Sequence, residues 1–272
     1  MLLSPTIPAR APTVLVTGAS VRLGEQICRS FAAKGWTVWC HYQHSEAAAH
    51  ALCADVRSHN GVAYAIQANL ADANDCARLM AHIVNTTGPL TCLVNNASSF
   101  EPDSAKDFGV QAARQQLEVN LLAPMQLSSL MAHSVADEGP AGQHSIIHIL
   151  DQKVFNLNPD YFSYTLSKLA LERSVALQAQ ALAPRLRVCG VAPGLMYLSG
   201  SQTQENFDVA GTVNLMRQAT DPAQVAASCV FLAENPCITG VTLTVDNGQH
   251  LVPLKRDVMF VVDAALKEHH GQ

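Results

Sequence analysis

The chain has 272 residues, of which 49% are apolar and 14% are charged, so it can bury a large core within one or two domains. A net charge of −5 with thinly spread Lys and Arg argues against nucleic acid as the main partner. No apolar run approaches the roughly 20 residues that span a membrane, and the first residues lack the basic start of a signal peptide. Eight cysteines without a C-x-x-C pair favour reduced thiols in a cytoplasmic protein. The histidine and cysteine spacings predict no metal site.

Strands and helices alternate along most of the chain. After a loose arm at residues 1–12, short apolar runs predict strands at 13–16, 36–42, 61–70, 90–96, 144–150, 186–194 and 241–246. Helical patterns lie between these runs, including a long one over 107–136, and another from 222 to 233. The alternation predicts one α/β domain over residues 13–250, a Rossmann-type doubly wound sheet of about seven parallel strands. The polar segment 195–215 is long for a connection, which is typical of a lid. Residues 251–272 form a C-terminal extension.

A glycine-rich turn joins the first predicted strand to the first helix, in the sequence TVLVTGASVRLG. Gly18 and Gly24 flank Arg22 and Leu23 there. Strand, turn and helix in this order bring backbone N–H groups and the positive end of a helix to one spot, which suits a phosphate. The alternative is an ordinary turn that needs Gly18 for its backbone angles.

The end of the second strand bears on the choice of dinucleotide. An Asp or Glu at this position commonly holds the ribose 2′-OH of NAD. Here the run His41, Tyr42, Gln43, His44, Ser45 contains no carboxylate, so a hydroxyl, an imidazole and nearby Arg22 would accept a 2′-phosphate. We therefore expect NADPH rather than NADH. Ser45 also has the position of a helix N-cap, and both roles can hold together.

Tyr164 and Lys168 lie four residues apart in a predicted helix, on one face. A free phenol has a pKa of about 10, and a cation held close lowers it, which is one way to make a general acid. The pair alone could be two unrelated residues on a helix face. However, Gly18, Asn96 and Asp151 also follow strand ends, as do Ser45 and Pro193, and ligands of parallel sheets bind at that edge.

Across roughly residues 12–250 the chain resembles the short-chain dehydrogenase/reductase family. The matching residues are TGASVRLG, NNAS, Asn120, the YTLSK run, Pro193-Gly194 and VDNG at 245–248. The resemblance implies that Tyr164 donates a proton, that Lys168 lowers its pKa and binds the nicotinamide ribose, and that Asn120 supports a proton-relay water. The cofactor-binding residues that it implies are Gly18, Arg22, Leu23, Gly24, His41, Tyr42, His44, Ser45, Asn69, Leu70, Asn96, Ala97, Ser98, Tyr164, Lys168, Pro193 and Gly194.

Three departures from the family pattern resemble the pteridine reductases. Arg22 replaces the usual middle glycine, NNASSF replaces NNAG, and Asp151 stands where a Ser is usual, thirteen residues before the Tyr. By this resemblance Asp151 assists proton transfer, Phe100 stacks on a pterin, and Ser45 binds the 2′-phosphate, although His44 replaces the Arg of better-known members. The implied substrate-binding residues are Arg22, Ser98, Phe100, Asp151, Tyr164, Gly194 and Leu195. The alternatives are a structural cap for Asp151 and loop packing for Phe100.

The resulting hypothesis is an NADPH-dependent pteridine or dihydropteridine reductase that passes hydride to a dihydropterin or dihydrofolate. A carbonyl reductase acting on a small ketone or acyl substrate, and an NADP-binding sensor without turnover, are the alternatives. The resemblance also implies a homotetramer. It places the extension at a subunit interface, where Arg256 could border a neighbour's active site.

Overall fold

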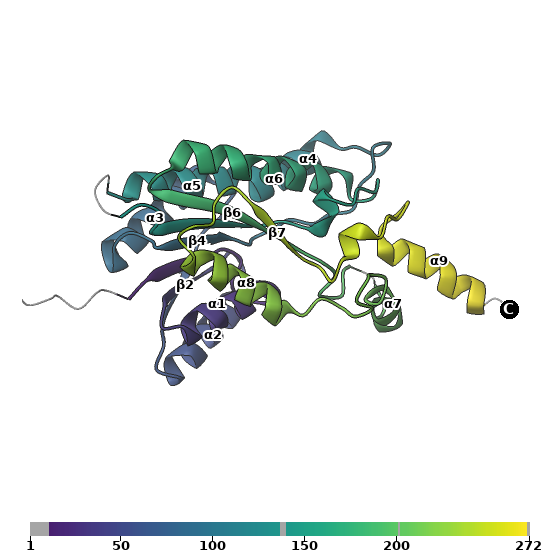
Figure 1. Ribbon diagram of the computed structural model, residues 1–272, viewed down its shortest axis with the longest axis horizontal. Coiled ribbons are helices and arrows are strands. Elements are labelled where there is room, and N and C mark those ends of the chain that lie inside the picture. The colour runs from purple at the N-terminus through teal and green to yellow at the C-terminus, as the bar shows by residue number, and fades with distance from the viewer. Residues whose placement is uncertain (1–10, 137–139, 201, 271–272) are drawn as a thin grey trace, which may run out of the picture.

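The computed structural model describes residues 11–136, 140–200 and 202–270. The predicted N-terminal arm therefore lies almost wholly outside the described residues. Every strand of the described chain belongs to one sheet, with helices on both faces (Figure 1).

Seven parallel strands form the sheet, in the order β3-β2-β1-β4-β5-β6-β7. The predicted Rossmann-type fold is confirmed. The order reverses between β1 and β4, which is where ligands of doubly wound sheets bind. The strand bounds are β1 Thr13–Val16, β2 Thr37–Tyr42, β3 Val62–Gln67, β4 Cys92–Asn95, β5 His144–Ile149, β6 Leu186–Pro193 and β7 Thr242–Val245.

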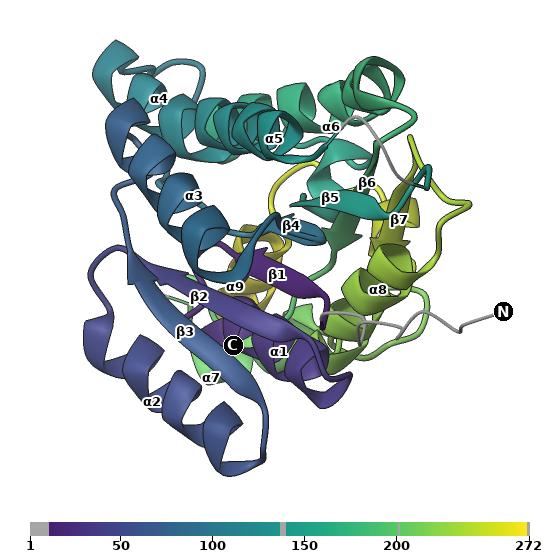
Figure 2. The same cartoon turned by 90° about the vertical axis from the view of Figure 1, so that its left-hand side faces the viewer.

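Helices cover the two faces in separate layers (Figure 2). One layer contains α1 (Arg22–Ala33), α2 (Glu46–Ser58) and α8 (Pro222–Glu234), and the other contains α3 (Ala73–Thr87), α4 (Val110–Leu117), α5 (Ala123–Ser134) and α6 (Phe162–Leu182). Because side chains alternate along a strand, Val14 and Val16 pack in the first core with Ile27, whereas Leu15 packs in the second with Ile83. Strands buried on both faces explain the continuous apolar runs of the sequence.

The predicted helix over 107–136 is continuous but irregular. A π-helical turn, Glu118–Leu122, separates α4 from α5 and contains Asn120. Such turns are rare and often mark functional positions. The turn rotates the helix at the point where Asn120 enters the protein interior.

Two helices lie beyond the carboxyl end of the sheet, α7 (Gln204–Ala210) and α9 (Val258–His270) (Figure 1). They share a small apolar cluster that includes Ala210, Val258 and Val262. The segment 195–215 therefore contains a packed helix, although the sequence predicted a lid without regular structure. None of the helices in the described part of the chain combines the length and apolar character that crossing a bilayer requires.

Candidate active site

The glycine turn after β1 is built for a close backbone approach. Gly18 has a φ of +61°, and a Cβ on it would lie 3.0 Å from the Cα of Ala97. A Cβ on Gly24 would lie 2.2 Å from the carbonyl oxygen of Gly18. Only glycine fits at these two positions. The N-terminus of α1 thus lies directly against the end of β1, as a phosphate site requires.

His41 supports this turn from the end of β2. Its Nδ1 accepts a hydrogen bond from the Gly18 N–H at 3.1 Å, and its Nε2 lies 3.1 Å from the Ala68 carbonyl oxygen, to which it donates. Burial lowers the pKa of His41 to about 4, so the ring is neutral. With both nitrogens engaged, His41 is not free to bind a 2′-phosphate, which corrects that expectation.

Ser45 remains available at the same edge. It precedes α2 in the N-cap position, but its side chain makes no capping hydrogen bond, and it is exposed beside His44. A helix N-terminus that lacks a capping side chain leaves amide donors for another acceptor. Tyr42 and Asn69 lie nearby; the Asn69 amide oxygen accepts from Gln43 at 3.1 Å.

Asn96 ties the fourth strand to the glycine turn. Its side-chain amide donates to the carbonyl oxygens of Thr17 at 2.9 Å and Gly18 at 3.1 Å. The main-chain N–H groups of Asn96 and Ala97 both donate to the Thr17 hydroxyl. These contacts fix the loop that continues into Ser98 and Phe100.

Asn120 is fully buried, and its side chain has only protein partners. Its oxygen accepts from the Ser98 hydroxyl and the Ser99 N–H, at 3.2 and 2.7 Å. Its nitrogen donates to the Ser99 carbonyl at 2.8 Å and the Ser167 hydroxyl at 3.0 Å. Asn120 therefore links the loop after β4 to α6. It lines neither of the cavities described below, and its predicted support of a relay water stays a prediction.

Asp151 and Tyr164 form the centre of the site. The Tyr164 hydroxyl donates to Asp151 Oδ2 at 2.9 Å, and the Lys153 N–H donates to Oδ1 at 2.8 Å. Burial is the main reason that the pKa of Asp151 is raised. Burial and the nearby negative charge of Asp151 hold the pKa of Tyr164 well above its usual range. Tyr164 therefore keeps its proton, and Asp151 releases one less readily than an exposed carboxyl group does.

Lys168 lies beside the pair but is directed elsewhere. Its Nζ donates to the Ile149 carbonyl oxygen at 2.8 Å and lies 5.7 Å from the centre of the Tyr164 ring. Burial lowers the pKa of Lys168 to about 8. Burial and Asp151 dominate the pKa of Tyr164 in this arrangement, so the expected lowering by Lys168 stays a prediction.

Phe100 lies next to Tyr164 and is stacked on Tyr161, with ring centres 4.1 Å apart and planes at 22°. Its ring also meets that of Tyr164 edge-on at 4.6 Å. Phe100 is 38% exposed. One face of Phe100 is thus supported by Tyr161 while part of its surface remains open to a planar ligand.

Two cavities follow the carboxyl edge of the sheet and share lining residues, among them Arg22, Asn96 and Ser98. The first, of about 320 Å³, brings together Arg22, Leu23, Asn96, Ser98, Phe100, Asp151, Tyr164, Lys168, Pro193, Gly194 and Leu195. The second, of about 360 Å³, brings together Gly18, Arg22, Leu23, Gly24, His41, Leu70, Asn96, Ala97 and Ser98. The Arg22 guanidinium donates to the Leu198 carbonyl oxygen at 2.9 Å, so it binds the loop after β6. Of the predicted residues, Tyr42, His44, Ser45, Asn69 and Asn120 line neither cavity.

Sequence reasoning missed several residues of the first cavity. Tyr161, Gln202, Asp257 and Met259 line it, and two of them belong to the C-terminal extension. The only sequence signal for Asp257 is its place before a helical run, where it caps α9 by accepting from the Met259 N–H at 3.2 Å. In the described ranges, no three His, Cys, Asp or Glu side chains form a group that could hold a metal.

The comparisons with known proteins agree with this geometry. A family model described as enoyl-(acyl carrier protein) reductase matches residues 18–250. Pteridine reductase 1 from Leishmania tarentolae is 32% identical, covering 92% of this chain and 99% of its own length. Dihydromonapterin reductase from Shigella flexneri is 26% identical, covering 88% and 96%. FolM alternative dihydrofolate reductase 1 from Brucella suis, solved in complex with NADP, is 33% identical with a TM-score of 0.84, covering 90% and 97%.

The chain therefore belongs to the short-chain dehydrogenase/reductase family of oxidoreductases. Within that family its relatives include pteridine reductases, which confirms the resemblance carried by Arg22, NNASSF and Asp151.

Proposed function

We propose that the protein is an NADPH-dependent reductase of a pterin, with a dihydropterin or dihydrofolate as the substrate class. The observation that carries the proposal is the buried hydrogen bond between Tyr164 and Asp151, which lines a cavity of about 320 Å³ together with Phe100. A pterin is flat, apolar on its faces and polar at its edges. Phe100 offers a face for stacking, and the carboxyl and phenol offer polar partners at an edge.

The second cavity fits a dinucleotide phosphate. Its floor is the turn in which Gly18 and Gly24 leave no room for a side chain, at the N-terminus of α1. Ser45 lies just after β2, and its hydroxyl makes no capping hydrogen bond to α2. Relatives solved with NADP support the same choice. When bound, the reduced nicotinamide supplies a hydride.

The residues of the chain manage the proton. Reduction of a C=N bond adds a hydride to carbon and a proton to nitrogen. A donor must hold its proton at neutral pH; burial and Asp151 keep the pKa of Tyr164 well above its usual range, and burial raises the pKa of Asp151 above that of an exposed carboxyl group. Their hydrogen bond lets one group give up a proton while the other stabilises the charge that remains. Lys168, fixed to the Ile149 carbonyl oxygen, keeps a cation near that charge.

The test is the loss of NADPH absorbance with a dihydropterin, with dihydrofolate, and with a panel of simple ketones, each repeated with NADH. Turnover of a dihydropterin or dihydrofolate with NADPH is the expected result. Turnover of ketones alone would point to a carbonyl reductase, and tight NADPH binding without any turnover to a sensor. Either outcome would remove the pterin assignment.

We also propose that the protein forms a homotetramer. Exposed apolar side chains on the outer surface of the helical layer that contains α5 and α6 support this proposal. Leu122, Leu166 and Leu177 are large apolar side chains exposed there. Exposed apolar groups of this kind favour subunit contact when they lie together. Sedimentation of the purified protein tests this directly, and a monomer at all concentrations would contradict it.

A further inference from the structure

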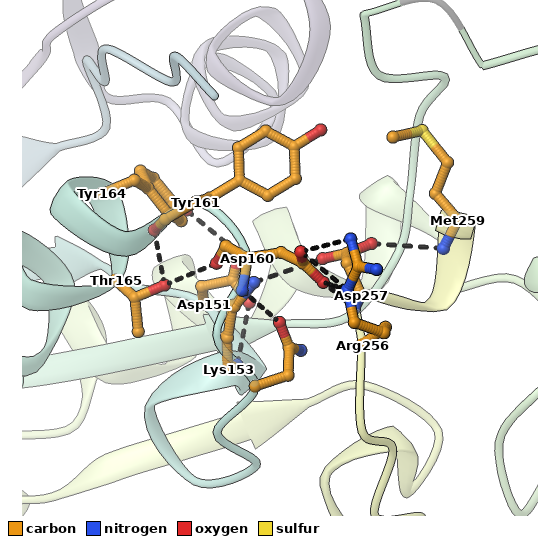
Figure 3. A network of polar contacts seen from close by, with 10 residues as sticks. Asp151, Lys153, Asp160, Tyr161, Tyr164, Thr165, Arg256, Asp257 and Met259 are labelled. Atoms are coloured by element: carbon orange, nitrogen blue, oxygen red, sulfur yellow. Dashed lines mark hydrogen bonds and ion pairs between the residues drawn. The ribbon is translucent and has the colours of Figure 1, made fainter. Parts of the chain in front are cut away.

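The C-terminal extension lies across the loop that connects the two central residues of the site. This loop, residues 152–163, runs from Asp151 to Tyr164. Arg256 and Asp257, just before α9, contact it near both of its ends (Figure 3). The resemblance suggested that Arg256 could border a neighbour's active site; within its own chain, Arg256 pairs with Asp160.

Lys153 makes the contact near the start of the loop. Its N–H donates to Asp151, and its Nζ lies 3.4 Å from Oδ2 of Asp257. The Lys153 side chain is only 4% exposed, and its Nζ lies 5.3 Å from the centre of the Tyr161 ring. A buried ammonium requires a compensating charge, since an unpaired one costs several kcal/mol. Asp257 supplies that charge next to the residue that holds Asp151.

Asp160 makes the contact near the end of the loop. Its carboxylate accepts from Arg256 Nε at 2.9 and 2.8 Å and from the Asp257 N–H at 2.7 Å. Asp160 precedes Tyr161, whose φ of +53° is unusual for a residue with a side chain and directly precedes α6. The Thr165 hydroxyl donates to the Tyr161 carbonyl oxygen at 2.8 Å. These bonds fix the first turn of α6, which carries Tyr164.

We propose that Arg256 and Asp257 are positioning residues of the reaction. Through their contacts with Asp160 and Lys153 they hold Asp151 and Tyr164 in their relative positions. The proposal rests on the function assigned above, in which this pair manages the proton. It gives the C-terminal extension a role in the active site of its own subunit.

We call the group Lys153, Asp160, Arg256 and Asp257 the clamp. Its charges also change the pKa values of Asp151 and Tyr164. Beyond the effect of burial, Lys153 lowers the pKa of Asp151, whereas Asp257 raises the pKa of both Asp151 and Tyr164. Among the described residues, Lys168 on α6 also lies beside the pair, and Arg22 lines the same cavity. Removing the charge of Lys153 should therefore raise the pKa of Asp151. Removing the charge of Asp257 should lower the pKa of both Asp151 and Tyr164.

The experiment measures kcat and kcat/KM against pH, with NADPH and the dihydropterin that the wild type reduces best. Reduction needs a protonated donor, so activity is lost as the pH rises through the pKa of the donor. Asp257→Asn should move this alkaline limb to lower pH and Lys153→Met to higher pH, each by roughly half a pH unit or more. The double variant should return toward the wild-type limb. Lys255→Met, an exposed lysine outside the clamp, is the matched control and should not move it.

A second readout separates positioning from stability. In hydrogen exchange, Arg256→Gln and Asp257→Asn should raise exchange several-fold in residues 152–163 and leave the β1–α1 turn unchanged. The proposal would be overturned if the variants changed neither the alkaline limb of the pH–activity profile nor the hydrogen exchange of residues 152–163. It would also be overturned if Lys153→Met and Asp257→Asn moved the alkaline limb in the same direction. A wild-type protein without pterin turnover would instead refute the proposed function, and the exchange measurement would still test the clamp.

Discussion

The phenol of Tyr164 is hydrogen-bonded to Asp151 at 2.9 Å, while the ammonium of Lys168 is bonded to the main chain at Ile149. The hydrogen-bonded partner of the phenol is therefore a carboxyl group rather than an amine. Because Asp151 also accepts the Lys153 N–H, its orientation is fixed before a substrate arrives. A site arranged in this way favours a substrate that accepts a proton and has a polar edge.

Replacement of Asp151 by Asn tests the role of the carboxyl group. The amide oxygen of Asn can still accept from the Lys153 N–H, and its NH2 group can donate to the Tyr164 oxygen, but the side chain cannot gain or release a proton. We expect kcat for the dihydropterin to fall by about a hundredfold or more, since positioned proton transfer contributes that much. Steady-state kinetics and circular dichroism are the measurements. Asp107→Asn, at an exposed carboxylate that accepts from Ser104, is the control. An Asp151→Asn enzyme with half of the wild-type kcat would contradict the assignment.

His41 should make the folded protein sensitive to acid. Burial lowers its pKa in the folded state to about 4, whereas an unfolded chain takes up the proton near pH 6.5. The neutral His41 ring therefore makes its full contribution to the free energy of unfolding above about pH 6.5, and this contribution is lost as the pH falls toward 4. Between pH 7 and 5, His41→Asn should lose about 2 kcal/mol less of its free energy of unfolding than the wild type.

Urea unfolding at several pH values is the measurement for His41. The variant His50→Asn, at an exposed ring, is the control and should follow the wild-type curve. If His41→Asn and the wild type lost stability in parallel, the ring would not be held neutral by burial.

Much of the fold was predictable from the sequence because it depends on local and repeated signals. Each strand is an apolar run, and a turn or a helix follows it, so the alternation alone indicates a parallel sheet. The positions of Gly18, Asn96 and Asp151 at strand ends then predict one shared edge. Where the pattern was interrupted, prediction was weaker: α7 lies inside a polar segment, and its packing against α9 joins residues far apart in the chain.

The missed parts of the site are those set by tertiary contacts. Nothing local in the sequence shows that His41 turns inward to Gly18, or that Asp257 returns to Lys153. The spacing of Tyr164 to Lys168 is visible in the sequence, whereas the burial of Tyr164 and its hydrogen bond to Asp151, which raise its pKa, are not. Local spacing identified the candidate groups, and the fold determines their surroundings.

Ser45 is the position at which the cofactor preference can be tested. Its hydroxyl makes no capping bond, so we expect it to be free for the 2′-phosphate. Ser45→Asp should place a negative charge there and weaken NADPH binding by roughly tenfold or more, with little change for NADH. Fluorescence titration of each nucleotide is the measurement. Ser58→Asp, at the other end of α2, is the control. Equal weakening of both nucleotides by Ser45→Asp would place the 2′-phosphate elsewhere.

Phe100 and Phe108 are a matched pair of residues with which stacking of the pterin on Phe100 can be tested. Both rings are partly exposed, at 38% and 46%, but only Phe100 lines the cavity with Asp151 and Tyr164. Phe100→Ala should raise KM for the dihydropterin by about tenfold, because an aromatic pair contributes about 0.5–1.5 kcal/mol beyond the area that it buries. Phe108→Ala, which loses an edge contact with Phe162 outside the cavity, should leave KM unchanged. Similar KM values in the two variants would show that Phe100 only packs against Tyr161, and that the pterin is held by polar contacts at its edge.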